Sequence, residues 1–203
     1  MLRWNKLERP LILASRSPRR KQILENMGLA FTVEVPDVEN EESYIHGERI
    51  EESIQKLAHV KALSVAARFP SALILGSDTI VVIDKQVIGK PANREDAKLM
   101  LQRLSGKRHT VYSGVALYCE ELHFSKTAVA CTDVLFRTVE EWEIDEYLDH
   151  DEYADKAGAY AIQGRAMTFI DKINGCFYNV MGLPVIETIE MYNAYIDFLK
   201  GRH

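Results

Sequence analysis

The feature that most constrains the fold is the apolar run Leu11–Ala14, which stops at two serines, a proline and a cluster of cations in "SRSPRRK". A short, continuous apolar run with polar flanks is typical of a buried strand. Ser17 then fits the N-cap of a helix and Pro18 its first position. A strand that leads directly into a helix favours an α/β protein, in which ligands usually lie at strand ends.

The next segments continue this alternation. Residues 30–35 alternate as a strand, and residues 48–68 carry apolar side chains at helical spacing. Residues 72–75 predict a second buried strand that is broken by "GSDT". Two further apolar runs, 80–83 and 87–88, flank a turn and predict a hairpin.

The second half of the chain predicts longer hairpins. A helix follows Asn93, and two long antiparallel strands meet at residues 120–121. A capping box at residues 138–141 opens another helix, "MTFIDKI" and "CFYNVMG" predict a strand pair, and Pro184 opens the last helix. We therefore expect an α/β fold on one mixed, twisted sheet flanked by helices.

Composition limits the class of partner. The chain has 203 residues, 47% of them hydrophobic, and a net charge of -5, which disfavours the broad basic face of a nucleic-acid binder. The three cysteines show neither metal spacing nor a disulfide framework, as expected in a reducing cytoplasm. The polar N-terminus does not resemble a signal peptide, and no run reaches the roughly 20 apolar residues of a membrane span. We expect a cytoplasmic protein with no membrane and no nucleic-acid polymer as partner.

The segment "SRSPRR" is the first candidate site. Helix-start N–H groups, the hydroxyls of Ser15 and Ser17 and the guanidinium groups of Arg19 and Arg20 together suit a phosphate group. A capped surface helix with solvated arginines explains the same residues equally well. The segment lacks the glycine and lysine pattern of a P-loop.

Asp78 is the second candidate. It lies between two strongly apolar runs, where a carboxylate is costly to desolvate unless a cation or metal accompanies it. Such a group suits a general base or a metal ligand. The alternative is an exposed aspartate that caps a turn.

Other polar side chains are weaker candidates for a functional site. Lys61 lies on or beside the apolar stripe of its helix, where a lysine at the edge of the stripe is the commoner outcome. Lys90 follows a predicted strand and either reaches the same cleft or lies in a loop. Asp155 and Lys156 open a Gly/Ala-rich stretch that ends at Gln163. The Gln163 amide either hydrogen-bonds to the edge of a nucleotide base or faces solvent.

Taken together, the motifs resemble the Maf family of nucleoside triphosphate pyrophosphatases almost from end to end. The resemblance implies a single domain over residues 1–203, related in fold to the inosine triphosphate pyrophosphatases, with two lobes around a central cleft. It also implies hydrolysis of a nucleoside triphosphate to the monophosphate and pyrophosphate with a divalent cation, Mg²⁺ or Mn²⁺. The segments that carry it are "LASRSPRR" (13–20), "KLAHVKA" (56–62), "GSDTIVV" (76–82), "GKP" (89–91), "LSGKRHTVYSGVAL" (104–117), "DKAGAYAIQG" (155–164), "INGCFYNVMGLP" (173–184) and Glu187.

Within the family, "DKAGAYAIQG" resembles the branch that acts on dTTP and UTP, including modified pyrimidine nucleotides. The resemblance assigns the proton acceptor to Asp78, which is also a candidate metal ligand, and substrate choice to Arg19, Thr79 and Gln163. The acidic loop departs from the family pattern: it offers Glu39, Glu41 and Glu42 as the further metal ligand, and Glu39 is our choice. The triphosphate is assigned to Arg19, Arg20, Lys61 and Lys90. The other residues assigned to substrate binding or specificity are Ser15, Ser17, Thr79, Asp155, Lys156 and Gln163.

Three other readings remain open at this point. The first is a 7-methyl-GTP-selective pyrophosphatase, and the second is a non-catalytic nucleotide-binding regulator of division. The third is a purely structural protein that uses "SPRR" as a helix cap. A homodimer is compatible with all of them.

Overall fold

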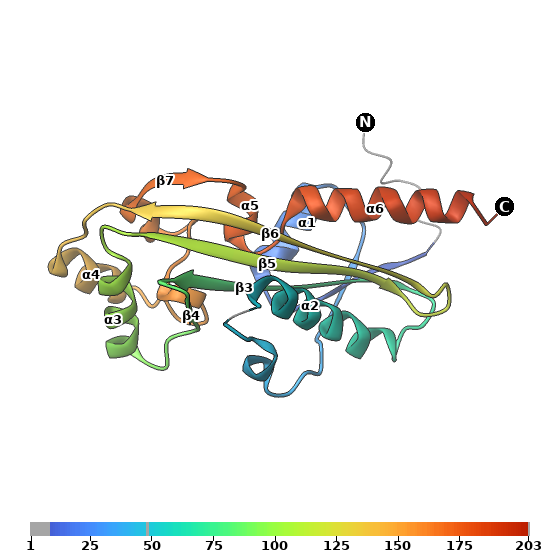
Figure 1. Cartoon of the computed structure of the whole chain (residues 1–203), viewed down its shortest axis with the longest axis horizontal. Coiled ribbons are helices and arrows are strands. Elements are labelled where there is room, and N and C mark those ends of the chain that lie inside the picture. Colours follow the sequence, from blue (N-terminus) through green and yellow to red (C-terminus); the bar gives the residue numbers. More distant parts are fainter. Residues whose placement is uncertain (1–8, 48, 203) are drawn as a thin grey trace. The chain divides into compact units, whose positions relative to one another are not determined.

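The computed structural model describes residues 9–47 and 49–202, and its strands form one seven-stranded mixed sheet (Figure 1). The strand order is β2-β1-β3-β5-β6-β7, with β4 paired to β3. The strands are β1 (Leu11–Ala14), β2 (Thr32–Glu34), β3 (Leu73–Ile83), β4 (Gln86–Ile88), β5 (Arg108–Cys119), β6 (Phe124–Phe136) and β7 (Ile170–Asn174). The α-helices are α1 (Pro18–Asn26), α2 (Ile50–Ala66), α3 (Arg94–Leu104), α4 (Glu141–Leu148), α5 (Phe177–Met181) and α6 (Val185–Lys200). The expected α/β fold on one mixed sheet is confirmed.

The chain divides into two compact units, and β3, β5 and β6 contribute residues to both. Unit 1 comprises Met1–Asp78, Ser113–Ala130 and Gly182–His203, and unit 2 comprises Thr79–Tyr112 and Cys131–Met181. Short 3-10 helices, η2 (Glu41–Tyr44) in unit 1 and η3 (Ala157–Ala159) and η4 (Arg165–Phe169) in unit 2, lie in the loops.

In unit 1, β1 lies between β2 and β3, and both pairings are parallel. The whole of β1 is buried, as its apolar sequence requires. Ala14 pairs with Gly76 of β3, so Ser15 and Ser77 each come one residue after a paired position. The serine and arginine segment after β1 therefore begins beside Ser77 and Asp78, at the edge where ligands of parallel sheets usually bind.

Helix α2 lies directly on β3 and β5 because both strands carry a glycine beneath it. A Cβ atom on Gly76 would lie 2.3 Å from the Ala58 carbonyl oxygen, and one on Gly114 would lie 2.2 Å from that of Ile54. Such distances are far inside van der Waals contact, so only glycine permits this approach. Ala58 is fully buried in the resulting core, together with Ile12, Ala14, Ala62, Val65, Ala66, Ala72, Ile74 and Ala116.

Helix α6 packs alongside β6 in unit 1 (Figure 1). The ring of Tyr195 meets that of Phe124 at 5.2 Å between centroids in an edge-to-face arrangement, and Tyr195 is fully buried. Edge-to-face aromatic pairs add stability beyond the area they bury. Pro184 lies at the N-cap of α6, which confirms the expected start of the last helix.

In unit 2, a buried aromatic cluster fixes the segment that contains η3. His109 Nε2 of β5 lies 2.8 Å from the Tyr160 hydroxyl, and the Phe136 ring of β6 lies 5.0 Å from both rings. Burial lowers the pKa of His109 to about 4, while the nearby charge of Asp133 acts in the opposite direction. The neutral imidazole is therefore part of the packing that holds Tyr160, and with it the "DKAGAYAIQG" segment, against the sheet.

Three expectations about elements are wrong. Strand β3 is continuous through "GSDT", because the Ser77 hydroxyl is bonded inside the sheet and Asp78 is ion-paired. The capping box of α4 joins Glu140 and Glu143, two residues later than the expected 138–141. The segment "CFYNVMG" contains the helix α5, not a strand, after the positive φ of Gly175 turns the chain.

The remaining boundaries agree closely with expectation. The strand expected at 30–35 is the shorter β2, and the helix expected at 48–68 is α2, whose expected start at residue 48 lies outside the described residues. The caps predicted at Ser17 and Asn93 are confirmed, since each side chain accepts a backbone N–H of its helix.

Replacing Gly114 with alanine tests the contact between α2 and the sheet. We expect the free energy of unfolding to fall by about 1–3 kcal/mol, because the new methyl group overlaps the Ile54 carbonyl. Urea denaturation measures the change. Gly201→Ala is the control, since its Cβ would meet only ordinary contacts at 3.7 Å and beyond. Equal midpoints for the two variants would contradict the close approach.

The buried imidazole of His109 predicts a pH dependence of stability. The unfolded chain binds this proton near the ordinary pKa of 6.5 and the folded chain only near 4, so stability falls as pH drops through this interval. The loss amounts to about 2 kcal/mol between pH 7 and pH 5. His109→Gln, which stays neutral and retains a polar group for Tyr160, should lack this component. Parallel slopes of unfolding free energy against pH for wild type and variant would reject it.

Candidate functional site

The buried ammonium of Lys61 is the centre of the candidate site in unit 1. Its Nζ donates to Glu41 Oε2 at 2.8 Å and to Asp78 Oδ1 at 2.6 Å, and Lys61 is only 6% exposed. A buried ammonium requires such partners, because removing it from water is costly. The lysine is therefore not a side chain at the edge of the stripe, and Asp78 is not an exposed turn cap.

The local fold explains why these three side chains meet. Lys61 comes three residues after Ala58 on the same helix face, and Ala58 and Ala62 lie against Gly76 of β3. Asp78 follows Gly76 by two residues in the same strand. Glu41 comes from η2, in the acidic loop, and its Oε2 accepts from the same ammonium at 2.8 Å.

The segment "SRSPRR" forms a hydrogen-bonded turn at the start of α1. Ser15 Oγ accepts from the backbone N–H of Ser17 and from Arg20 Nη1, both at 3.1 Å. Ser17 Oγ accepts from the Arg20 N–H at 3.4 Å and so caps the helix. Arg20 Nε donates to the Gly182 carbonyl at 2.7 Å, so this guanidinium is held inside the protein.

Charge links this turn to the carboxylates. Burial lowers the pKa of Arg20, whereas the negative charges of Asp78 and Glu41 raise it. Arg20 thus lies within electrostatic range of both acids. Arg19 is half-buried on the same first turn of α1. The structure brings together within unit 1 the expected residues Ser15, Ser17, Arg20, Lys61 and Asp78, and adds Glu41.

The expected residues Thr79, Lys90, Asp155, Lys156 and Gln163 lie in unit 2. Thr79 follows Asp78 in β3 and is half-buried, whereas Lys90 and Gln163 are exposed. Asp155 is exposed and has a left-handed backbone with φ of 59°, and Lys156 Nζ donates to the Ala154 carbonyl at 3.0 Å.

One backbone hydrogen bond joins two of the unit 2 motifs. The N–H of Gly158 donates to the Gly89 carbonyl at 2.9 Å. Gly89 precedes Lys90 in "GKP", and Gly158 lies within "DKAGAYAIQG". The two segments that sequence reasoning chose separately are therefore neighbours in unit 2.

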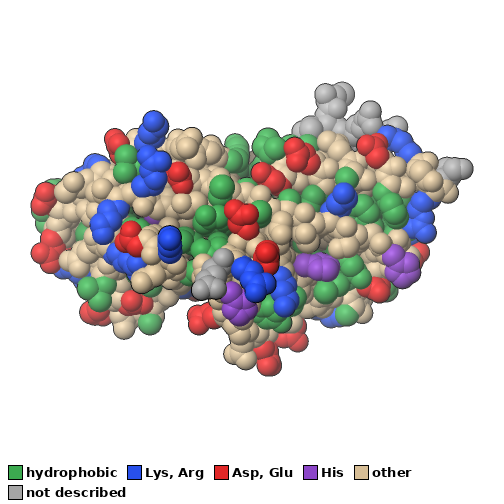
Figure 2. Space-filling model, in the orientation of Figure 1, with side chains coloured by type: hydrophobic (Ala, Val, Ile, Leu, Met, Phe, Trp, Pro, Cys, Tyr) green, Lys and Arg blue, Asp and Glu red, His purple; other side chains and the backbone are tan. Residues whose placement is uncertain are grey.

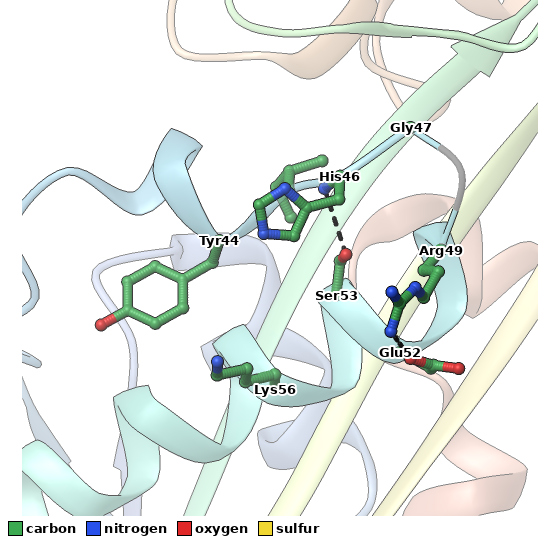
Figure 3. Close-up of a pocket in the computed structure, with 8 residues that line it drawn as sticks. Tyr44, His46, Gly47, Arg49, Glu52, Ser53 and Lys56 are labelled. Carbon is green, nitrogen blue, oxygen red and sulfur yellow. Dashed lines mark hydrogen bonds and ion pairs between the residues drawn. The ribbon is translucent and has the colours of Figure 1, made fainter.

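A hollow of about 720 Å³ lies at the start of α2 and contains none of the expected residues (Figure 3). Within it the backbone N–H of His46 donates to Ser53 Oγ at 3.1 Å, and Lys56 Nζ lies 5.9 Å from the centre of the Tyr44 ring. These contacts fix the chain that leaves η2, and so they help to hold Glu41. The lining residues are Tyr44, Ile45, His46, Gly47, Arg49, Glu52, Ser53 and Lys56.

Glu41 and Asp78 are the carboxylates of this site, and carboxylate oxygens are the usual protein ligands of a divalent cation. One oxygen of each lies within 2.8 Å of the Lys61 ammonium, so both face a common point. Mg²⁺ is usually held by one or two carboxylates together with substrate phosphates. Within residues 9–47 and 49–202, no group of three or more His, Cys, Asp or Glu side chains is placed to hold a metal.

Sequence reasoning chose Glu39 over Glu41 in the acidic loop and did not single out Ser77. Glu39 is exposed, and it is Glu41 that lies against Lys61. Ser77 was given no role, yet it is fully buried and hydrogen-bonded beside Asp78. A serine hydroxyl between two apolar runs was the available signal, because a buried hydroxyl requires a partner.

On the face shown in Figure 2, acidic and basic side chains are interspersed rather than gathered by sign. This face does not have the continuous basic patch that nucleic-acid binding requires. Across the described part of the chain, no helix has both the length and the apolar character needed to cross a membrane.

Comparison with known proteins identifies close relatives. The dTTP/UTP pyrophosphatase of Symbiobacterium thermophilum is 46% identical over 187 residues, which cover 91% of this chain and 93% of the relative. The dTTP/UTP pyrophosphatase of Desulforamulus reducens is 45% identical and covers 92% and 97%. That of Vibrio cholerae is 42% identical and covers 91% and 97%.

A family model described as Maf-like protein matches residues 10–195, nearly the full length of the chain. The match includes β1, the α1 cap, Lys61, Asp78 and the "DKAGAYAIQG" segment. The resemblance drawn from the motifs is confirmed, and the chain belongs to the Maf family.

Proposed function

We propose that the chain hydrolyses dTTP and UTP, and modified pyrimidine nucleotides of the same shape, to the nucleoside monophosphate and pyrophosphate. The observation that carries the proposal is the buried Lys61 between Glu41 and Asp78, next to the serine and arginine turn after β1. The relatives that cover nine-tenths of the chain bear the name dTTP/UTP pyrophosphatase. The 7-methyl-GTP-selective enzyme and the non-catalytic regulator are not favoured.

Asp78 is the proposed proton acceptor. A water molecule attacks the α-phosphorus of the nucleotide, and its proton passes to the Asp78 carboxylate. The bond between the α-phosphorus and the bridging oxygen breaks, and pyrophosphate leaves with the electron pair of that bond. The carboxylate is half-buried in a paired strand, so its direction is set before substrate binds.

The cations of the site neutralise the triphosphate, which carries about four negative charges near pH 7. Arg19 on the first turn of α1, Lys61 and Lys90 are the proposed partners of the phosphates, with the hydroxyls of Ser15 and Ser17 at the helix start. When the nucleotide arrives, the Lys61 ammonium is shared between the carboxylates and the phosphates.

A divalent cation, Mg²⁺ or Mn²⁺, is proposed to bind at Glu41 and Asp78, with Glu41 in place of Glu39. Bound there, it would supply positive charge to the leaving pyrophosphate. Carboxylate oxygens are ligands that Mg²⁺ prefers, and substrate phosphates usually complete such a site.

Selection of the base is assigned to Arg19, Thr79 and Gln163. The Gln163 amide both donates and accepts, as the edge of a pyrimidine requires, and its segment is fixed to the sheet through Tyr160. Asp155 and Lys156 open the same segment and are proposed to contact the nucleotide.

The three free cysteines, Cys119, Cys131 and Cys176, support the proposed location in the cytoplasm.

A panel of nucleoside triphosphates with Mg²⁺ or Mn²⁺ tests the proposed function, with pyrophosphate release as the readout. We expect dTTP and UTP to be the best substrates and 7-methyl-GTP to be poor. Nucleotide binding without release of pyrophosphate would instead support the regulator, and failure of every nucleotide to raise Tm would support a structural role.

Asp78→Asn should lower kcat for dTTP by about 10²–10⁴, because the amide cannot accept the proton of the attacking water. Asp171→Asn, at an exposed position of β7, is the matched control and should retain wild-type activity. Near-normal turnover by Asp78→Asn would remove Asp78 from its proposed role.

Gln163→Ala should change the preference among nucleotides more than it changes the best rate. Loss of one hydrogen-bonding group to a base edge corresponds to about 1–3 kcal/mol of discrimination, which is measured as the ratio of kcat/KM for UTP and CTP. Gln102→Ala, exposed on α3, provides the comparison. The same ratio in both variants would show that Gln163 does not read the base.

A further inference from the structure

The carbonyl oxygen of Gly182 accepts from two side chains that belong to different parts of the candidate site. Arg20 Nε of α1 donates to it at 2.7 Å, and Ser77 Oγ of β3 lies 3.3 Å from it. The Ser77 hydroxyl also donates to the Gly114 carbonyl of β5 at 2.8 Å. One backbone oxygen thus connects the start of α1 to the residue before Asp78.

We propose that Ser77 is a positioning residue for Asp78 and that the Gly182 carbonyl couples it to Arg20. The proposal rests on the proposed function, since it concerns how the proton acceptor is held. It gives Arg20 a second role, beside its charge, in fixing the serine and arginine turn relative to β3.

Burial makes these bonds firm. Ser77 is fully buried, and Arg20 is 9% exposed. A polar group that loses its partner in such surroundings bears the full desolvation cost, so each donor stays on its acceptor. A hydroxyl has a single hydrogen, which is directed chiefly to Gly114 at the shorter distance and is shared with Gly182. Gly182 has a φ of 120°, a backbone conformation that glycine adopts readily and that other residues rarely adopt.

The tether acts on Asp78 through the strand. Successive side chains of a strand point to opposite faces, so Ser77 is held on one face while Asp78 meets Lys61 on the other. With both side chains bound, the backbone between them cannot rotate or slide. A displacement of about 1 Å at a reacting group lowers rates by about 10²-fold. The hydroxyl of Ser77 therefore contributes to kcat without touching substrate.

The test compares Ser77→Ala with Ser105→Ala. Ser105 is a matched control, because its hydroxyl also joins distant backbone groups, the N–H and carbonyl of Val139, but it lies in unit 2 at the end of α3. We expect Ser77→Ala to lower kcat for dTTP by about tenfold to a hundredfold with KM changed less than about twofold. Ser105→Ala should keep kcat near that of wild type.

A double-mutant cycle tests the coupling through Gly182. Arg20→Lys, Ser77→Ala and the double variant are assayed at a temperature at which circular dichroism shows all of them folded. Because both side chains act on one carbonyl, the double variant should lose less than the product of the two single losses. Losses that multiply would overturn the coupling.

The outcomes separate this inference from the proposed function. An inactive wild type would reject the proposed function itself. An active wild type with an equally active Ser77→Ala would overturn the positioning role alone. Should Ser77→Ala not fold, Ser77→Cys retains the volume and a weaker donor, and its kcat should fall by a smaller factor; an unchanged kcat would again overturn the role.

Discussion

The contact between the backbone of α2 and the sheet determines where the charges of this site lie. Gly76 and Gly114 remove the two Cβ atoms that would hold the helix away, and Ala58 and Ala62 keep the helix surface small. Lys61, on the same helix face, is thereby lowered to the level of the strand and meets Asp78 at 2.6 Å. A larger residue at either glycine would push α2 away from the sheet, and the Lys61 ammonium would move away from Asp78.

Positive and negative side chains of the candidate site lie close to one another. One ammonium lies between the carboxylates of Glu41 and Asp78, and the guanidinium of Arg20 is buried among neutral acceptors within their field. Buried charge is costly without compensation, so this arrangement gains most when a polyanion and a divalent cation enter together. The family relationship and the electrostatics are both compatible with the proposed binding of a nucleotide together with a divalent cation.

Much of the fold could be predicted because local signals agreed with tertiary structure. Ser17 caps α1, the apolar run of β1 is buried, and the motif containing Asp78 lies at the site. The continuity of β3 could not be predicted, since "GSDT" resembles a break unless the partners of Ser77 and Asp78 are known. Glu41 could not be separated from Glu39, because a loop without periodicity gives no register. The helix α5 was mistaken for a strand because its aromatic residues have high strand propensity.

The continuity of β3 has a consequence for how enzymes of this kind diversify. Asp78 lies in a regular, hydrogen-bonded strand, where few substitutions are tolerated. Residues 155–164 instead follow an irregular path, with left-handed backbone conformations at Asp155, Gly158 and Ala159. Substitutions accumulate more readily in the irregular path. With residues 155–164 in the proposed role of reading the base and Asp78 in that of proton acceptor, recognition of new bases can change in that stretch while the strand that carries the acid stays the same.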